Sequence, residues 1–237
     1  MAEKKTQAAE NKKHTLANQI YQDLKNCITK KDYIPGEKLN IKELARKYNV
    51  SDTPVKQALQ RLSDEKLVVN TPNKGMSVRA LTPEELNDIF DMRLMLDTFF
   101  SKDIISTLNY NDSLGRQLLD NLEEQKKFIQ ATESSAQPEK YFSLDMDFHI
   151  LFLTASGNQK AVDVLVNLQP FTYATGTYLN QPHSRDCECV AEHEAILNAA
   201  FRGDAEALNE AVLTHIENSR RALQLIFKVN QMVLPND

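Results

Sequence analysis

The spacing of apolar residues predicts three short helices in the first third of the chain. Leu16, Ile20, Leu24 and Cys27 recur every three or four residues, which is the period of a helix with one buried face. The turn pair Pro35-Gly36 ends that segment. A second, shorter helix is predicted over residues 41–48, with Leu44 and Ala45 facing inward.

The third helix is predicted to begin at Ser51 and to reach Glu65. Serine is a favoured N-cap residue, and Pro54 falls in the first turn, where its missing amide hydrogen costs nothing. The tight connection Asn49-Val50 joins this helix to the one before it. Its buried face consists of Val55, Leu59 and Leu62.

Two short β-branched stretches follow in LVVNTPNKGMSVRAL, and they predict a hairpin around residues 72–75. Three short helices and a hairpin are the outline of a winged helix-turn-helix, whose third helix lies in the major groove of DNA. Lys74 at the hairpin tip is placed to reach the DNA backbone or the minor groove. We therefore expect a DNA-binding domain over residues 14–79, preceded by a disordered polar tail over residues 1–13.

The rest of the chain has a helical pattern throughout. After a linker over residues 80–82, Thr82 is a good N-cap and Pro83 suits the first helical position. The apolar period predicts six helices with short connections, which describes an antiparallel helical bundle over residues 83–237. Their predicted spans are 83–108, 112–132, 138–155, 158–179, 187–201 and 204–230. The predicted fold class is therefore mainly α.

Composition points to a cytoplasmic protein. The chain has 41% hydrophobic and 26% charged residues, and no apolar run approaches the roughly 20 residues of a membrane span. The N-terminal stretch MAEKKTQAAENKKH is polar and lacks the apolar core of a signal peptide. Three cysteines do not suggest a disulfide framework. Cys187 and Cys189 form a C-x-C pair, which is a weak signal for a soft metal.

The net charge of −5 conceals two oppositely charged segments. Residues 1–79 carry 16 Lys and Arg against 9 Asp and Glu, whereas residues 80–237 carry 12 against 24. A basic segment joined to an acidic one suggests that only the first part meets a polyanion. Uneven surface charge without a partner is the alternative.

Four ligand-type side chains fall on predicted buried faces of the bundle. Asp145 and His149 are one helical turn apart, flanked by apolar residues. His193 shares a face with Ile196 and Leu197. His215 lies in the stripe Leu208, Val212, His215, Ser219, Ala222 and Ile226.

A divalent metal accounts for this grouping, because burying three imidazoles and a carboxylate without a cation costs much desolvation energy. One Asp and three His suit zinc first, and also nickel, manganese or iron(II). A single buried histidine is more often an ordinary core residue, and Asp145 could instead orient His149.

At this point the sequence resembles a known family. LNIKELARKYNVSDTPVKQALQRLSDEKLV and the PNKG wing are similar to the operator-binding module of GntR-type bacterial transcription regulators. MRLMLDTFF, LDMDFHILFLTASGN, EHEAILNAAFRGD and the final histidine resemble the FCD effector domain of the FadR subfamily, in its VanR-like branch. The resemblance covers roughly residues 15–230.

The resemblance implies a metal held by Asp145, His149, His193 and His215, one per chain, with a small carboxylate as effector. It implies that Arg93 and Asn158 contact that effector. Ser219, one turn past His215, is expected to face the same pocket. The alternative for Arg93 is a solvated ion pair with Asp97.

The resemblance also implies contacts to DNA. Its expected contact residues are Lys42, Ser51, Asp52, Thr53, Lys56, Lys74 and Gly75. Asp52 departs from the family, which commonly has a guanine-reading arginine there. An acid in the first turn stabilises a helix by about 0.3–1 kcal/mol through the helix dipole. Alternatively Asp52 accepts a hydrogen bond from the amino group of a cytosine. The operator sequence stays open.

We therefore expect a ligand-responsive transcription regulator, a repressor, that binds operator DNA as a homodimer and is not an enzyme. A homodimer is expected because paired recognition helices must meet two half-sites. A regulator that senses the metal itself is one alternative. A metal-dependent hydrolase is another, with Asp147 or Glu192 as general base, although both fall off the ligand faces of their helices.

Overall fold

The computed structural model describes residues 16–28, 32–80, 82–131, 138–174 and 181–233. The chain divides into two compact units, one of Met1–Leu81 together with Pro170–Gly176 and one of Thr82–Gln169 together with Thr177–Asp237. The predicted tail over residues 1–13 lies outside the described residues. Within the described part, no helix has both the length and the apolar character needed to cross a membrane.

The first unit has the predicted elements in the predicted order. A helix over residues 16–28 precedes α2 (Ile41–Lys47), α3 (Asp52–Asp64), β1 (Val68–Thr71) and β2 (Gly75–Val78). One apolar core joins them, and Val55, Leu59 and Leu62 of α3 are fully buried in it. Burying this face of α3 leaves its opposite face in solvent.

The turn between α2 and α3 is fixed by backbone hydrogen bonds. The amide of Val50 donates to the carbonyl of Ala45 and that of Asn49 to Arg46, which is the Schellman ending of a helix. Asn49 has φ of 52°, a left-handed conformation that asparagine tolerates better than most residues. This tight ending positions α3 immediately after α2.

The hairpin is paired in antiparallel register, with Val68 opposite Val78 and Thr71 opposite Gly75. Asn73 and Gly75 both have positive φ, which allows the chain to reverse within the loop. On its other edge β2 exchanges backbone hydrogen bonds with Glu37 and Leu39. The wing is therefore held from both sides.

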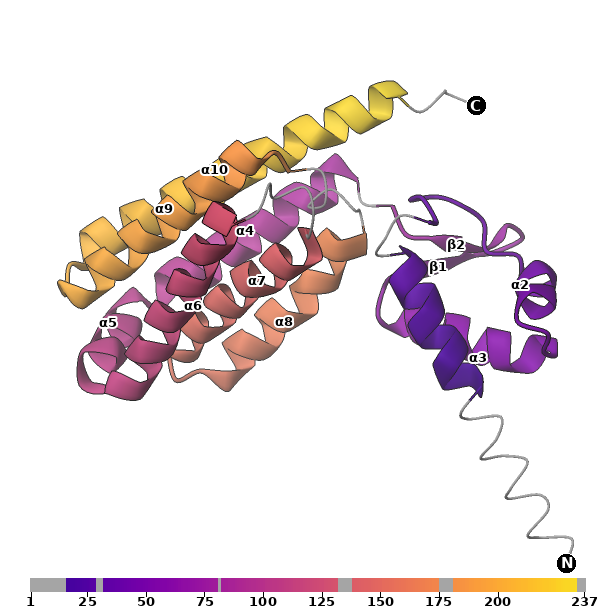
Figure 1. Ribbon diagram of the computed structural model, residues 1–237, viewed down its shortest axis with the longest axis horizontal. Helices are drawn as coiled ribbons and strands as arrows, with labels where there is room; N and C mark the ends of the chain where they lie inside the picture. Colours follow the sequence, from indigo (N-terminus) through magenta and orange to yellow (C-terminus); the bar gives the residue numbers. More distant parts are fainter. Residues whose placement is uncertain (1–15, 29–31, 81, 132–137, 175–180, 234–237) are drawn as a thin grey trace, which may run out of the picture. The chain divides into compact units, whose positions relative to one another are not determined.

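The second unit is a helical bundle (Figure 1). Its helices are α4 (Pro83–Phe99), α5 (Ser101–Tyr110), α6 (Asp112–Ala131), α7 (Pro138–Thr154), α8 (Gln159–Ala174), α9 (His183–Phe201) and α10 (Ala205–Val233). Helix α10 packs against α9 and α4, and α6 packs against α7 and α9. The mainly α fold class is confirmed. The last residues of the predicted span 158–179 lie outside the described residues.

Two predicted helix boundaries were wrong. The span 83–108 is two helices, because α4 ends at Phe99 and α5 begins at Ser101. The hydroxyl of Thr98 donates to the carbonyl of Leu94, a side-chain bond that competes with the helical ladder and favours a bend. Helix α9 begins at His183 rather than at residue 187. The earlier start brings Arg185 and Asp186 into the helix.

Candidate metal centre

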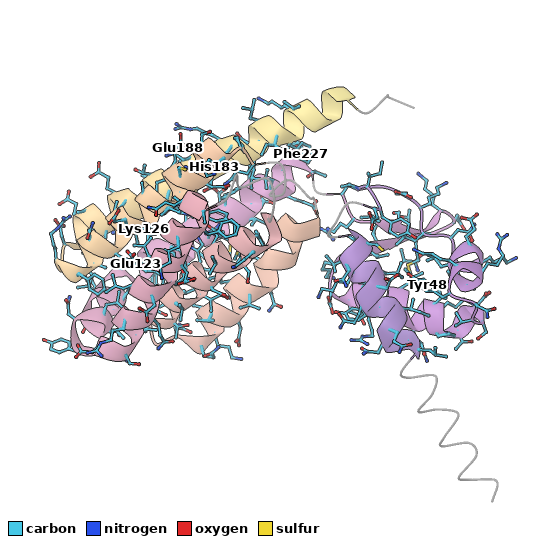
Figure 2. The ribbon with its side chains drawn as sticks, viewed as in Figure 1. Tyr48, Glu123, Lys126, His183, Glu188 and Phe227 are labelled. Atoms are coloured by element: carbon cyan, nitrogen blue, oxygen red, sulfur yellow. The ribbon has the colours of Figure 1, made fainter. Side chains whose placement is uncertain are left out.

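Three helices bring the four predicted ligands into the interior of the bundle. Asp145 and His149 come from α7, His193 from α9 and His215 from α10. Their exposed fractions are 0%, 2%, 0% and 1%, so all four are buried as predicted. At the surface an ion pair joins α6 to α9, because Nζ of Lys126 lies 2.8 Å from Glu194 of α9. The same Nζ lies 3.4 Å from Glu123, one turn earlier on α6 (Figure 2).

The three imidazoles face one another at short range. The Nε2 atoms of His149 and His215 are 3.2 Å apart. The ring centroid of His193 lies 5.1 Å from that of His149 and 4.7 Å from that of His215. Phe148 stacks on the His193 ring with a centroid distance of 3.9 Å and closes that side of the cluster with an apolar surface. The sequence-predicted histidines therefore form one site.

Residues outside the cluster orient two of the rings. Nδ1 of His215 lies 2.8 Å from Oε2 of Glu192, and Nδ1 of His193 lies 2.9 Å from Oε1 of Gln125. Both partners are acceptors, so each Nδ1 carries the hydrogen and each Nε2 presents a lone pair to the cluster. The orientation of the Gln125 amide is fixed because its nitrogen donates to Asn121 and to the carbonyl of Leu144. A carboxylate or amide behind a histidine is the usual support of a metal ligand.

Cys189 also lies in the cluster, one turn before His193 on α9. Its Sγ is 3.3 Å from Oδ1 of Asp145 and 3.8 Å from Nε2 of His193. The potential ligand atoms form three overlapping sets, and within each set they lie within 4.8 Å of one another. These sets are His149, His193 and His215; Asp145, Cys189 and His193; and Cys189, Glu192 and His215. Asp145 therefore shares a ligand set with His193 and Cys189, and His193 in turn shares one with His149 and His215.

Burial dominates the electrostatics of the site. It lowers the pKa of His149 and His193 well below 6.5, and the positive charge of Arg93 adds to that effect. The pKa of His215 is also lowered by burial, although its hydrogen bond to Glu192 partly offsets the shift. Burial raises the pKa of the Cys189 thiol, and the nearby Asp145 carboxylate adds to the rise. The cluster thus offers neutral imidazole nitrogens, which are the form that binds metals.

Glu192 contacts this cluster, although its position off the ligand face of its helix had suggested otherwise. Both of its oxygens are 2.7 Å from the guanidinium of Arg185, and Asn218 donates to it at 2.8 Å. Burial raises the Glu192 pKa, but the bonds from His215, Arg185 and Asn218 outweigh it and hold the pKa at about 2. Glu192 is therefore a fixed anion that positions His215. Asp147, the other base considered for a hydrolase, is exposed.

Arg93 is buried beside this cluster, with 4% of its side chain exposed. Among the described residues its Nε and Nη2 atoms have no hydrogen-bond partner, although both are shielded from solvent. Asp97, one turn further along α4, is 2% exposed, and burial raises its pKa to about 6 against the opposing influence of Arg93. The alternative of a solvated ion pair does not describe these two residues. Arg93 instead has unused N–H groups in a dry interior.

The other two predicted effector contacts differ in position. Ser219 is buried and accepts a hydrogen bond from Nη2 of Arg185 at 3.1 Å, which links it to Glu192 and the cluster. Asn158 is exposed, and its side-chain oxygen accepts from the amides of Lys160 and Ala161 at the start of α8. Its hydrogen bonds are those of a helix cap. Its contact with an effector stays a prediction.

The predicted DNA-contacting residues lie on the exposed surface of the first unit. Ser51, Asp52, Thr53 and Lys56 lie at the start of α3, Lys42 lies on α2, and Lys74 and Gly75 lie in the wing; all seven are exposed. Asp52 occupies the first turn of α3, where its charge favours the helix dipole. Ser51 is the N-cap by backbone conformation, but its side chain makes no capping hydrogen bond.

A winged helix-turn-helix joined to a helical bundle with a buried histidine cluster defines a class of DNA-binding regulators. The model of bacterial regulatory proteins of the gntR family matches residues 16–78, and the FCD domain model matches residues 88–218. The chain therefore belongs to the GntR family of bacterial transcription regulators and carries an FCD domain. The resemblance to a GntR-type operator-binding module joined to an FCD domain is confirmed.

Curated relatives and solved structures agree with this assignment. The chain is 26% identical over 213 residues to the HTH-type transcriptional repressor RspR of Escherichia coli, covering 90% of each chain. It is 24% identical over 212 residues to the HTH-type transcriptional regulator YdhC of Bacillus subtilis, covering 89% of this chain and 92% of that one. These relatives are regulators and not enzymes.

The fold is also that of a GntR-type regulator from Rhodococcus. The two structures superpose with a TM-score of 0.65 at 18% identity, covering 88% of this chain and 97% of the other. At this identity the likeness concerns the fold alone.

Proposed function

We propose that this protein is a metabolite-responsive transcription repressor whose FCD domain holds one divalent metal and a small carboxylate. The observation that carries the proposal is the set of Nε2 lone pairs of His193 and His215, aimed inward by Gln125 and Glu192 beside His149. Supporting bonds of this kind fix the ring orientation and are typical of metal-binding histidines. The name of the relative RspR supports repression.

The donor set fits a first-row divalent cation. Asp145, His149, His193 and His215 would hold it, and zinc suits such nitrogen and oxygen ligands best, with nickel, manganese and iron(II) as alternatives. A cation held there would offer coordination positions to the oxygens of a carboxylate. In the metal-free protein Nε2–H of His149 donates to Nε2 of His215 at 3.2 Å, so the metal proposal rests on the convergence of the three rings and not on unsatisfied nitrogens.

The carboxylate is proposed from the residues around the cluster. The unpartnered N–H groups of Arg93 are buried, and a guanidinium in a dry site binds a carboxylate strongly. The hydroxyl of Ser219 and the guanidinium of Arg185 add further donors on the side of α10. Asn158 is kept as a further proposed contact. An anion that uses Arg93 satisfies groups that are otherwise left without partners.

The first unit is proposed to bind operator DNA as part of a homodimer in the cytoplasm. Lys42, Lys56 and Lys74 would contact phosphates, while Ser51, Asp52 and Thr53 at the start of α3 would meet base edges and Gly75 would allow the wing to approach the backbone. The effector can change DNA affinity only if it binds two arrangements of the protein unequally. We propose that binding of the effector lowers the affinity for DNA and so releases the operator.

The test uses duplexes selected from a random pool by the metal-loaded protein. A panel of small mono-, di- and tricarboxylates is then added while fluorescence anisotropy follows a labelled duplex. We expect at least one carboxylate to release DNA from the metal-loaded protein and not from the metal-free protein. If metal alone switches DNA binding and no carboxylate acts, the protein is a metal sensor. If no duplex is enriched, the regulator proposal fails.

A further inference from the structure

Cys189 lies among the metal-ligand candidates rather than beside them. Its side chain is 2% exposed, and two of the three overlapping ligand sets include its sulfur. It shares the inward face of α9 with His193, since the two residues are one helical turn apart. Its Sγ lies 3.3 Å from the carboxylate of Asp145 and 3.8 Å from the imidazole of His193, and Cys189 also shares a hydrogen bond with Tyr141.

We propose that Cys189 is a thiolate ligand of the metal centre, which would make it a mixed nitrogen, oxygen and sulfur site instead of one built from Asp and His alone. The inference rests on the proposed metal-binding function and specifies its ligands. Two ligand atoms about 2.0–2.3 Å from one zinc ion lie at most about 4.6 Å apart. The separations of Cys189 Sγ from Asp145 and His193 fall well within that limit.

Binding through sulfur requires the thiol to lose its proton. In the metal-free protein the S–H of Cys189 donates to Oδ1 of Asp145. On coordination the S–H bond breaks, its electron pair forms the bond to the cation, and one proton leaves to solvent. No oxidant or reductant takes part. The carboxylate of Asp145 is freed from the thiol in the same step and becomes available to the cation.

A buried cysteine often serves only as a small apolar residue. The surroundings of Cys189 argue against that role, because its sulfur contacts a carboxylate and an imidazole rather than an apolar wall. Cys187, two residues earlier, provides the contrast. It is half-buried, its nearest polar contact is His183 at 3.6 Å, and it is in none of the ligand sets among the described residues.

A thiolate would change which metals the site prefers. Sulfur ligands favour zinc and copper(I), whereas carboxylate and water favour manganese and magnesium. The site is therefore expected to bind zinc more tightly than manganese. In Cys189→Ser the difference between the two affinities is expected to be smaller. Cobalt(II) can stand in for zinc because it takes the same ligands and reports on them by its absorption.

The experiment loads the full-length protein with cobalt(II) and records its absorption spectrum. We expect a thiolate-to-cobalt charge-transfer band in the near ultraviolet for the wild type and for Cys187→Ser. We expect Cys189→Ser to bind cobalt without that band. A second measurement needs no variant: X-ray absorption of the zinc-loaded wild type is expected to show a sulfur scatterer at about 2.3 Å.

Each outcome separates the two proposals. Cobalt bound to the wild type without the band, together with zinc spectra lacking sulfur, would overturn the thiolate ligand and leave the metal centre standing. A band that persists in Cys189→Ser would also overturn it. If the wild type binds neither cobalt nor zinc, both the metal centre and its sulfur ligand are refuted. Should Cys189→Ser not fold, the zinc spectrum of the wild type decides alone.

Discussion

The Nε2 atoms of His149 and His215 face each other at 3.2 Å inside the bundle, and both rings are almost completely buried. Glu192 accepts a hydrogen bond from Nδ1 of His215, so the Nε2 of that ring points its lone pair at His149. Burial lowers the pKa of both rings, which leaves them neutral at pH 7. In the proposed function these two neutral imidazoles would both turn their Nε2 atoms to the cation.

The lowered histidine pKa values predict a stability loss in mild acid. The unfolded chain takes up protons near pH 6.5, whereas the folded metal-free chain resists protonation of His149, His193 and His215. The contribution is present above pH 6.5 and is lost as the pH falls through that value, because the unfolded state then binds more protons. Asp97, with its pKa raised to about 6, acts in the opposite direction: mainly below pH 6, its protonation makes the folded state more stable as the pH falls.

Urea unfolding of the metal-free protein between pH 7.5 and 6 measures this effect. We expect the free energy of unfolding to decrease as the pH is lowered, both in the wild type and in His183→Gln, whose ring is exposed. His149→Gln is expected to show a shallower slope. Equal slopes in all three proteins would contradict the account.

Replacing Glu192 with glutamine should weaken metal binding without removing a residue of the Asp and His ligand set. The change removes the charge that holds Nδ1–H of His215 and breaks the ion pair with Arg185. Loss of such a supporting group typically reduces metal affinity about 10- to 100-fold. Competition with a fluorescent chelator measures the affinity, and Glu194→Gln, an exposed site on the same helix that pairs with Lys126, is the control. Unchanged affinity in Glu192→Gln would count against this role.

Replacing Arg93 with methionine should weaken the response to a carboxylate effector while the metal stays bound. A hydrogen bond to a charged group contributes about 1.5–3 kcal/mol, so the carboxylate affinity is expected to fall roughly 10- to 150-fold. Isothermal titration of the metal-loaded variant with the active carboxylate gives this number. An unaltered affinity would show that Arg93 does not contact the effector, and its buried N–H groups would then need another explanation.

Asp52→Asn separates the two roles considered for that residue. As a charge in the first turn of α3, Asp52 should contribute about 0.3–1 kcal/mol to stability and nothing to base preference. We expect the variant to select the same duplexes as the wild type from a random pool. A changed preference at one base pair would instead identify Asp52 as a cytosine contact.

Lys56→Ala, by comparison, is expected to weaken binding to all DNA sequences. It should reduce the dependence of the logarithm of the binding constant on the logarithm of the salt concentration by about 1.

The sequence was sufficient for the features that depend on periodicity. The spacing of Asp145, His149, His193 and His215 on buried helical faces predicted which helices meet at the site, and all four are buried. The DNA-binding unit was predicted equally well, because Asn49, Pro54 and the Pro72–Gly75 turn are local signals that its backbone follows.

Features that depend on packing between helices were not predicted. Glu192 was placed off the ligand face, yet its long side chain reaches His215 from α9 to α10. Cys189 was weighed only as part of a C-x-C pair, although its spacing of four residues from His193 was a usable signal. Gln125 lies on a helix with no ligand, so no periodicity could connect it to His193. The earlier start of α9, which makes the Arg185–Glu192 pair, also depended on tertiary contacts.

Metal content per chain tests the central claim most directly. Protein purified without chelator or affinity tag is analysed by mass spectrometry of its metals, as wild type, His193→Ala and the exposed-site control His183→Ala. The account predicts close to one divalent metal per chain in the wild type and the control, and its loss in His193→Ala, which removes the ring that two of the ligand sets share. Wild-type protein that holds no metal even after reconstitution would contradict it.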